Sequence, residues 1–353
     1  MVTGTMSNKT FWENKKVLIT GNTGFKGSWL TILLLEKKAK IIGVSKKERK
    51  GLFLFNFLKL KNKISQYYLD IKNSKKIEKV IVKEKPDIIF HMAAQPIVRE
   101  SYINPINTLE TNVLGTINIL NSLQKLKNRT AFINITTDKV YKQNKKNNFS
   151  ENDPLGGNDI YSSSKACSDI ITHSFYKSFF EKKNIGIATA RAGNVIGGFD
   201  WSKNRIIPDT IRASFQKTKL LIRMPKSIRP WQHVLDVVNG YLKLSEKLYK
   251  NPYKYSGSWN FGPDKSSNKD VYTLVSKLSK VLIYSPKIVV KESNFHEEKS
   301  ITLNSNKSKK ELGWKQNFNF IKTIKLTANI YELYNKNLLK YDDFKKQAKL
   351  LKK

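Results

Sequence analysis

The chain has 353 residues, which is enough for about two domains of ordinary size or for one large α/β domain with an appended lobe. Hydrophobic residues make up 39% of the chain, so general disorder is excluded and a sizeable core is expected. The single cysteine, Cys167, excludes an intrachain disulfide and a cysteine-built zinc site. We therefore expect no metal, a reducing and so cytoplasmic location, and a buried Cys167.

The net charge of +37 comes from 65 basic residues against 28 acidic ones. Lysine supplies 57 of the basic residues and is scattered along the whole chain, whereas nucleic-acid readers concentrate arginine and aromatic residues on one element. We attribute most of the charge to a biased composition and expect no nucleic-acid partner. No apolar run approaches the roughly 20 residues needed to span a bilayer, so no membrane partner is expected either.

Apolar runs and helical stretches alternate through the first part of the chain. Long helices are predicted after a glycine turn at 21–27 and over 106–127 and 161–183, and strands are predicted at 16–20, 39–45, 65–71, 86–94, 129–137 and 184–197. This alternation predicts an α/β fold with a doubly wound parallel sheet, a Rossmann domain over residues 14–197.

The rhythm changes after about residue 197, where loops rich in Pro, Trp and Arg follow. We interpret 198–335 as a smaller, discontinuous, mixed α/β substrate lobe, with segments near 230–262 returning to the sheet domain. Residues 336–353 have few apolar positions and are predicted to form a basic, solvated terminal helix.

Three glycines, Gly21, Gly24 and Gly27, lie between the first strand and the first helix. In this context glycine allows a tight turn and brings the backbone close to a pyrophosphate at the helix N-terminus. The plain alternative is a structural turn. Ser45, followed by lysines, stands where an acidic residue would bind the ribose, so NAD and NADP both remain open. Asp70 could meet the adenine or simply cap the end of its strand.

A tyrosine and a lysine four residues apart, Tyr161 and Lys165, lie on one face of a predicted helix. An ammonium beside a phenol lowers the phenol pKa, which gives a usable base for a sugar hydroxyl. The pair follows a strand that ends in Thr137, Asp138 and Lys139. In the plain alternative, Asp138 caps the loop and Lys139 is a surface lysine.

Together these motifs resemble the extended short-chain dehydrogenase/reductase family and, within it, the nucleotide-sugar 4,6-dehydratases. TTDK and RPWQHV are the specific parts of this resemblance. The residues that carry it are GNTGFKGSWL (21–30), HMAAQPIVRESY (91–102), NVLGTINIL (112–120), TTDKVY (136–141), YSSSKACSD (161–169), RAGNVIGGFDW (191–201), RIIPD (205–209) and IRPWQHV (228–234).

The resemblance implies a lyase that removes water from CDP-glucose or another nucleotide-activated hexose, with NAD bound and NADP not excluded. Tyr161 and Lys165 would oxidise C4, Thr137 would hold the 4-oxygen, and Asp138 would protonate the leaving 6-hydroxyl. Lys139 stands where dTDP-glucose dehydratases carry Glu, and the C5 base is left open between Lys139 and Glu151. Other outcomes considered are a 4-epimerase, a C4 oxidase and a catalytically idle RNA-binding protein.

The resemblance also assigns binding residues by position. Those implied for the cofactor are Gly21, Thr23, Gly24, Phe25, Lys26, Gly27, Asp70, Ile71, Ala93, Ala94, Gln95, Tyr161 and Lys165. Those implied for the substrate are Gln95, Asn194, Arg205, Ile207, Pro208, Arg229 and Trp231, with Asn194 and the two arginines at the diphosphate.

Two positions depart from the family pattern, Phe199 in place of glycine and Glu100 in place of a basic residue, and both are expected on the substrate side. His91, on an apolar strand, is predicted to be a hydrogen-bonded core histidine. The resemblance further implies a homodimer through helices 106–127 and 161–182, with a tetramer left open.

Overall fold

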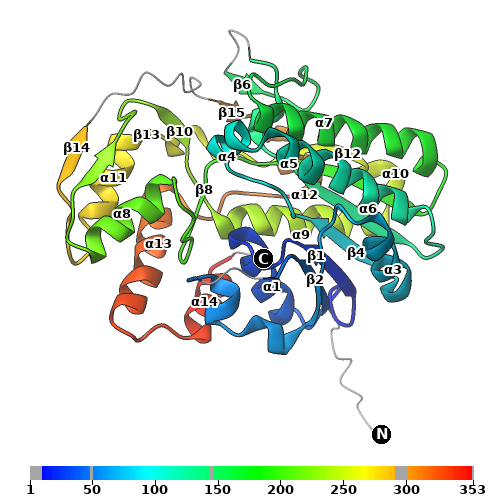
Figure 1. Ribbon diagram of the computed structural model, residues 1–353, viewed down its shortest axis with the longest axis horizontal. Coiled ribbons are helices and arrows are strands. Elements are labelled where there is room, and N and C mark those ends of the chain that lie inside the picture. Colours follow the sequence, from blue (N-terminus) through cyan, green and yellow to red (C-terminus); the bar gives the residue numbers. More distant parts are fainter. Residues whose placement is uncertain (1–9, 48–50, 144–146, 291–300, 352–353) are drawn as a thin grey trace, which may run out of the picture.

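The computed structural model describes residues 10–47, 51–143, 147–290 and 301–351. The predicted parallel sheet is confirmed, and helices cover both of its faces (Figure 1). Its seven strands all run parallel, in the order β12 (Gly257–Asn260), β7 (Ile185–Arg191), β5 (Thr130–Ile135), β4 (Ile88–His91), β1 (Lys16–Thr20), β2 (Lys40–Ser45) and β3 (Ser65–Tyr68).

The central strands are apolar at nearly every position because both faces of the sheet are buried. Successive side chains of a strand point to opposite faces. Val17 and Ile19 of β1 therefore enter one apolar core, while Leu18 enters the other. The first core lies under α1 (Phe25–Glu36) and α9 (Val234–Lys250).

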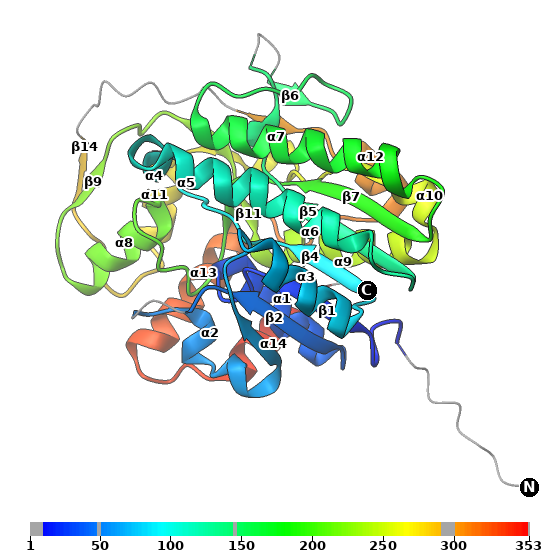
Figure 2. The same cartoon turned by 45° about the vertical axis from the view of Figure 1, so that its right-hand side comes forward.

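The second core lies under the helices of the opposite face. A π-helical turn at Glu110–Leu114 joins two of them, so the long helix expected at 106–127 is present with an irregular middle. These helices are α3 (Ser74–Glu84), α5 (Pro105–Leu109), α6 (Gly115–Leu123) and α7 (Ile160–Phe175), the last continued by a π-helical turn at Tyr176–Phe180. Figure 2 shows α5, α6 and α7 running side by side along this face.

A smaller lobe sits beyond the carboxyl ends of the sheet strands, built largely from residues after 197. Its core is apolar and contains Trp231 and Tyr331. Its elements are α8 (Ile206–Phe215), α11 (Val271–Ser279), α13 (Phe320–Asn335) and the strand pairs β9 (Leu220–Ile222) with β14 (Ile288–Val290) and β10 (Ile228–Pro230) with β13 (Asn268–Asp270).

Short elements connect the two parts. Two of the strand pairs bring distant segments together, β8 (Val195–Ile196) with β11 (Gln232–His233) and β6 (Asn148–Phe149) with β15 (Thr302–Leu303). The remaining helices are α2 (Leu54–Phe57), α4 (Val98–Ile103), α10 (Pro252–Tyr255) and α12 (Asn306–Leu312), with 3-10 turns at Leu60–Lys63, Asp138–Val140 and Lys265–Ser267.

The C-terminal helix is packed rather than solvated, which corrects the sequence expectation. In α14 (Tyr341–Lys349), Phe344 is fully buried and its ring lies 5.1 Å from that of Trp29 on α1. The apolar positions of the segment are few, but they fall on one face and meet the first core. This contact ties the chain end to the helix that follows the glycine turn.

We predict that Phe344→Ala lowers the free energy of unfolding by about 3–5 kcal/mol, because it leaves a cavity against Trp29. Chemical denaturation measures the loss. Leu350→Ala is the control, since Leu350 ends the same helix and is 43% exposed. Equal, small losses in both variants would mean that α14 does not pack as described.

Candidate active site

The glycine turn brings β1 into α1 without room for side chains. Gly21 has φ +72°, and a Cβ there would lie 2.7 Å from the backbone nitrogen of Ala93. A Cβ on Gly27 would lie 2.3 Å from the Gly21 carbonyl oxygen. Gly24, the exposed N-cap of α1, provides no side-chain cap, so the first N–H groups of the helix remain available to an anion such as a pyrophosphate.

Beside this turn, a hydrogen-bonded chain crosses the ends of β2 and β3. The Gln66 amide donates to the Ser45 hydroxyl at 3.1 Å and accepts from the Asn22 amide at 2.7 Å. Lys46 pairs with Asp70 at 2.9 Å. Burial works against ionisation of Asp70, but hydrogen bonds from Lys72 and Lys46 lower its pKa. Asp70 thus caps the turn after β3. It also forms an ion pair with Lys46 at the sheet edge where the adenosine ribose is expected.

The acid proposed from the sequence lies at the carboxyl end of β5, in the 3-10 turn Asp138–Val140. Asp138 is 5% exposed. Its Oδ1 accepts from the Thr137 hydroxyl at 2.8 Å, and its Oδ2 accepts from the Asn194 amide at 3.3 Å. The Thr137 side chain also lies close enough to the Tyr161 phenol to lower its pKa against the larger effect of burial. The structure therefore brings the three residues of the expected acid and oxidising groups into one cluster, and it adds Asn194 to them.

The tyrosine and lysine come from the first turns of α7, as expected. Lys165 donates to the Ile135 carbonyl at 2.8 Å, and burial lowers its pKa to about 7, with a further contribution from Lys26. Burial raises the pKa of Tyr161 to about 12, and Arg205 is the largest effect in the other direction. The expected lowering of the Tyr161 pKa by Lys165 is therefore wrong in this structure, because burial outweighs the nearby cations.

Lys26 extends the cluster from the first turn of α1. Burial lowers its pKa to about 8, followed by repulsion from Arg205, while Asp138 acts in the opposite direction. Its ammonium lies 6.0 Å from the ring centroid of the buried Tyr241 on α9. The Lys26 ammonium thus interacts with Asp138, Arg205 and Lys165, which come from three other parts of the chain.

The loop after β4 borders the glycine turn. Its Ala93 nitrogen donates to the Thr20 hydroxyl at 3.2 Å, and both Ala93 and Ala94 are partly buried. The Gln95 amide donates to the Ile97 carbonyl and the Thr108 hydroxyl, so both of its hydrogens are used within the protein. Gln95 thereby holds its loop onto α5.

Residues 18–327 match the family described as GDP-mannose 4,6 dehydratase. A CDP-glucose 4,6-dehydratase from Salmonella typhimurium is 39% identical over 90% of this chain and 91% of its own length. A dTDP-D-glucose 4,6-dehydratase from Dictyostelium discoideum is 31% identical over 78% of this chain and 64% of its own length. The chain belongs to the GDP-mannose 4,6 dehydratase family. The resemblance drawn from the sequence motifs is thereby confirmed.

Solved structures of related enzymes share the fold. A UDP-glucose 4-epimerase from Thermotoga maritima, determined with UDP-glucose, has a TM-score of 0.79 at 22% identity and covers 92% of this chain and 100% of its own. A dTDP-glucose 4,6-dehydratase from Bacillus anthracis, in complex with NAD, has a TM-score of 0.73 at 24% identity, covering 90% and 96%. The doubly wound fold of this family member is therefore the one expected.

Several of the binding residues that the family resemblance implied have side chains that are buried in a core. Ile207 and Trp231 are 3% and 5% exposed in the core of the smaller lobe, next to the buried Pro208. The Trp231 indole donates to the Lys269 carbonyl at 2.9 Å. Ile71 is 4% exposed and packs against Gly115. The side chains of Thr23, Phe25 and Arg229 are partly buried.

Two residues expected near the sugar have other surroundings. Phe199 is buried with φ +66°, and its ring lies 4.7 Å from Phe57 and 5.2 Å from Tyr334. It anchors an aromatic cluster under the smaller lobe, which corrects its placement on the substrate side. The Glu151 carboxylate accepts from the Asn260 backbone nitrogen at 2.9 Å on the edge strand β12, which argues against Glu151 as the C5 base.

The histidine prediction is confirmed and the cysteine prediction is wrong. His91 is 2% exposed and bonded to the hydroxyls of Thr20 and Thr116, and burial lowers its pKa to about 3. Cys167 is exposed, because it lies on the outer face of α7, opposite the buried Lys165 and Asp169.

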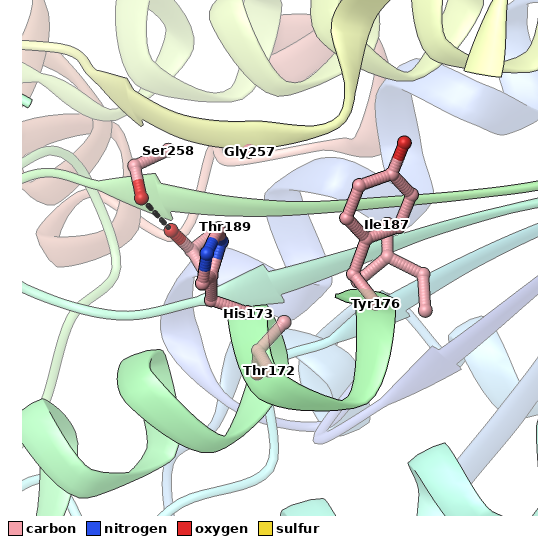
Figure 3. A pocket seen from close by; sticks show the side chains of 7 residues that line it. All are labelled: Thr172, His173, Tyr176, Ile187, Thr189, Gly257 and Ser258. Atoms are coloured by element: carbon pink, nitrogen blue, oxygen red, sulfur yellow. Dashed lines mark hydrogen bonds between the residues drawn. The ribbon is translucent and has the colours of Figure 1, made fainter. Parts of the chain in front are cut away.

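Two cavities lie along the later turns of α7, away from Tyr161 at its start. The smaller one is only about 10 Å³ and is bordered by His173, Thr189 and Ser258, the last two hydrogen-bonded to each other (Figure 3). The larger, of about 410 Å³, adjoins the buried Arg191–Asp169 ion pair. Within the residues that the structure describes, no cluster of three or more His, Cys, Asp or Glu could hold a metal, and no helix is both long and apolar enough to cross a membrane.

Sequence reasoning missed three residues of this site. Gly193 packs against Asp138, Gln232 is hydrogen-bonded to Gly193, and Tyr241 lies near Tyr161 and Lys26. Gln232 stands in the motif RPWQHV, which indicated the family but assigned the glutamine no role. Gly193 and Tyr241 had no local pattern to mark them.

We predict that Lys165→Met flattens the rise of stability with pH. Below about pH 7 the buried ammonium lowers the free energy of unfolding by its full amount. Between pH 7 and the ordinary lysine pKa of 10.5, only the unfolded chain binds the proton, so this loss of stability shrinks as the pH rises. In the variant, the increase of the unfolding free energy with pH in this window should be smaller by up to about 1 kcal/mol per pH unit, measured by urea unfolding. Lys75→Met, on the exposed surface of α3, is the control. Identical slopes in wild type and Lys165→Met would contradict the burial of this charge.

Proposed function

We propose that the protein removes water from a nucleotide-activated hexose to form a 4-keto-6-deoxyhexose, with CDP-glucose as the substrate and NAD as the resident cofactor. The observation that carries the proposal is the cluster of Thr137, Asp138 and Tyr161, in which an acid and an oxidising phenol share one threonine. The identity to the Salmonella typhimurium enzyme supports CDP-glucose over other activated sugars.

The residues present fit a dinucleotide. The Gly21–Gly27 turn leaves no space for side chains, and the uncapped N-terminus of α1 suits a pyrophosphate. A bound nicotinamide would supply the hydride acceptor for C4 oxidation and the hydride donor for the final reduction. Lys165 would bind the nicotinamide ribose, and Ser45 with Gln66 would meet the adenosine ribose. Because Lys46 is engaged by Asp70, we favour NAD over NADP.

Each proton transfer is assigned to a side chain of the cluster. Tyr161, in its phenolate form, removes the proton of the 4-hydroxyl while Thr137 holds the same oxygen. Asp138, in its acid form, protonates the departing 6-hydroxyl, and Lys139, the next residue, takes the C5 proton made acidic by the 4-ketone when its amine is neutral. Arg205, whose cation acts on both Lys26 and Tyr161, would bind the substrate diphosphate.

The function is tested by incubation with CDP-glucose, where we expect loss of one water and the alkaline absorbance of a 4-keto sugar. An epimerase would instead return an isomer of unchanged mass. A panel of other nucleotide-hexoses tests the choice of base. If none of them loses water, the proposed function is wrong.

Asp138→Asn should retain C4 oxidation and slow dehydration by about 100-fold or more, because the amide cannot protonate the leaving oxygen. Absorbance of reduced nicotinamide follows the first step, and the 4-keto product follows the second. Asp343→Asn, on α14, is the matched control and should behave as wild type. Unimpaired dehydration by Asp138→Asn would exclude its role as the acid.

We also propose a homodimer through the face formed by α4, α5, the π-helical turn Glu110–Leu114 and α7. This face exposes a row of large apolar side chains, which a soluble monomer seldom leaves in one patch. They are Tyr102, Ile103, Ile106, Leu114 and Ile170. A cytoplasmic location is proposed as well, because the free thiol of Cys167 is exposed and would need a reducing compartment.

Ile106→Glu should convert the dimer to a monomer, since it places a charge in the apolar contact. Sedimentation gives the mass. Ile283→Glu is the control, because Ile283 is equally exposed, 64% against 66%, but lies in the smaller lobe. A wild-type monomer, or a dimer that survives Ile106→Glu, would refute this interface.

A further inference from the structure

The carboxyl group of Asp138 rests directly on a neighbouring backbone. A Cβ at Gly193 would lie 1.8 Å from Asp138 Oδ2 and 2.1 Å from its Cγ, so only glycine is compatible with the position of this carboxyl. Asn194, the next residue, has φ +52° and donates its amide to the same oxygen at 3.3 Å. The place of Asp138 therefore depends on the Gly193–Asn194 turn that follows β7.

This turn is held by one buried side chain. The Gln232 Nε2 donates to the Gly193 carbonyl at 3.0 Å and to the Phe261 carbonyl at 2.9 Å. The Gln232 backbone nitrogen donates to the Asn194 carbonyl at 3.3 Å, which continues the pairing of β11 with β8. Gln232 is fully buried, and its strand β11 lies in the middle of the molecule (Figure 2).

The amide of Gln232 is oriented by its partners. Both Nε2 hydrogens are used on carbonyls of two different loops, one after β7 and one after β12. The opposite rotamer would set the amide oxygen against both carbonyls, which is repulsive. Its Oε1 has no partner among the described residues, a desolvation cost that a purely apolar residue at this position would avoid. Burying this amide therefore costs free energy at its oxygen, while its nitrogen makes two hydrogen bonds that an apolar side chain could not make.

We propose that Gln232 is a positioning residue for Asp138: it fixes the Gly193–Asn194 turn against which the catalytic carboxyl packs. The proposal rests on the proposed dehydratase function, in which Asp138 protonates the leaving hydroxyl. Gln232 itself would touch neither the sugar nor the cofactor. Its effect is confined to the step that uses Asp138, and C4 oxidation by Tyr161 proceeds without it.

The experiment compares Gln232→Leu with wild type in a single turnover of CDP-glucose. Leucine keeps nearly the same volume, so the change removes the two donors with little loss of packing. We expect C4 oxidation, followed by absorbance of reduced nicotinamide, to change less than about twofold. Dehydration should slow by about 10- to 100-fold, as expected for a misplaced catalytic group. Reduced cofactor therefore accumulates in the variant.

A double-mutant cycle separates positioning from general damage. In the Asp138→Asn background, Gln232→Leu should cause no further loss of dehydration, because residues that act through one group are not additive. Gln347→Leu is the matched control: Gln347 is also buried, donates to one carbonyl, has an unpartnered Oε1 and lies on α14. It should lose stability to a similar degree and keep both steps intact.

Three outcomes would overturn the inference: equal slowing of oxidation and dehydration, additivity with Asp138→Asn, or kinetics indistinguishable from those of Gln347→Leu. If Gln232→Leu does not fold, Gln232→Asn, which retains an amide donor on a shorter arm, enters the same comparison with the same expected result. Wild-type turnover is measured in parallel. Failure of the proposed function then appears as absence of product from wild type, whereas failure of this inference leaves wild-type dehydration intact.

Discussion

The contact between the carboxyl group of Asp138 and the backbone of Gly193 organises the centre of this molecule. It is possible because β5 and β7 are neighbours in a parallel sheet and end at the same edge. The residues that follow the two strands therefore meet, and the space between them admits no Cβ. Asp138 follows β5, and the backbone after β7 limits where its carboxyl group can lie. Its position therefore depends on the pairing of the two strands and not on its own loop alone.

A buried ion pair holds the catalytic helix onto these same strands. Arg191, at the end of β7, makes two hydrogen bonds to Asp169 of α7, and both side chains are 2% exposed. Thr136 and Thr189 donate to the same carboxylate from β5 and β7. Such a pair stabilises little relative to apolar packing, but losing one partner is costly. It ties α7, and with it Tyr161, to the end of β5.

Positive charge gathers where an anionic substrate is expected, and most of it is only partly solvated. Burial lowers the pKa of Lys26 and of Lys165, and repulsion adds to this, from Arg205 on Lys26 and from Lys26 on Lys165. An anionic ligand would relieve this repulsion. The +37 net charge of the chain is spread over its surface lysines, whereas these three groups are placed by the ends of α1, α7 and α8.

Strand and helix order, the glycine turn and the Tyr161–Lys165 pair were determined by the sequence itself. Each of these depends on local periodicity or on spacing within one element, which the sequence displays directly. Only the tertiary structure decided that burial raises the Tyr161 pKa, that Phe199 and α14 belong to the apolar core, and that Gln232 lies behind the acid. These facts depend on solvent exclusion and on contacts between segments far apart in the chain, for which no local pattern exists.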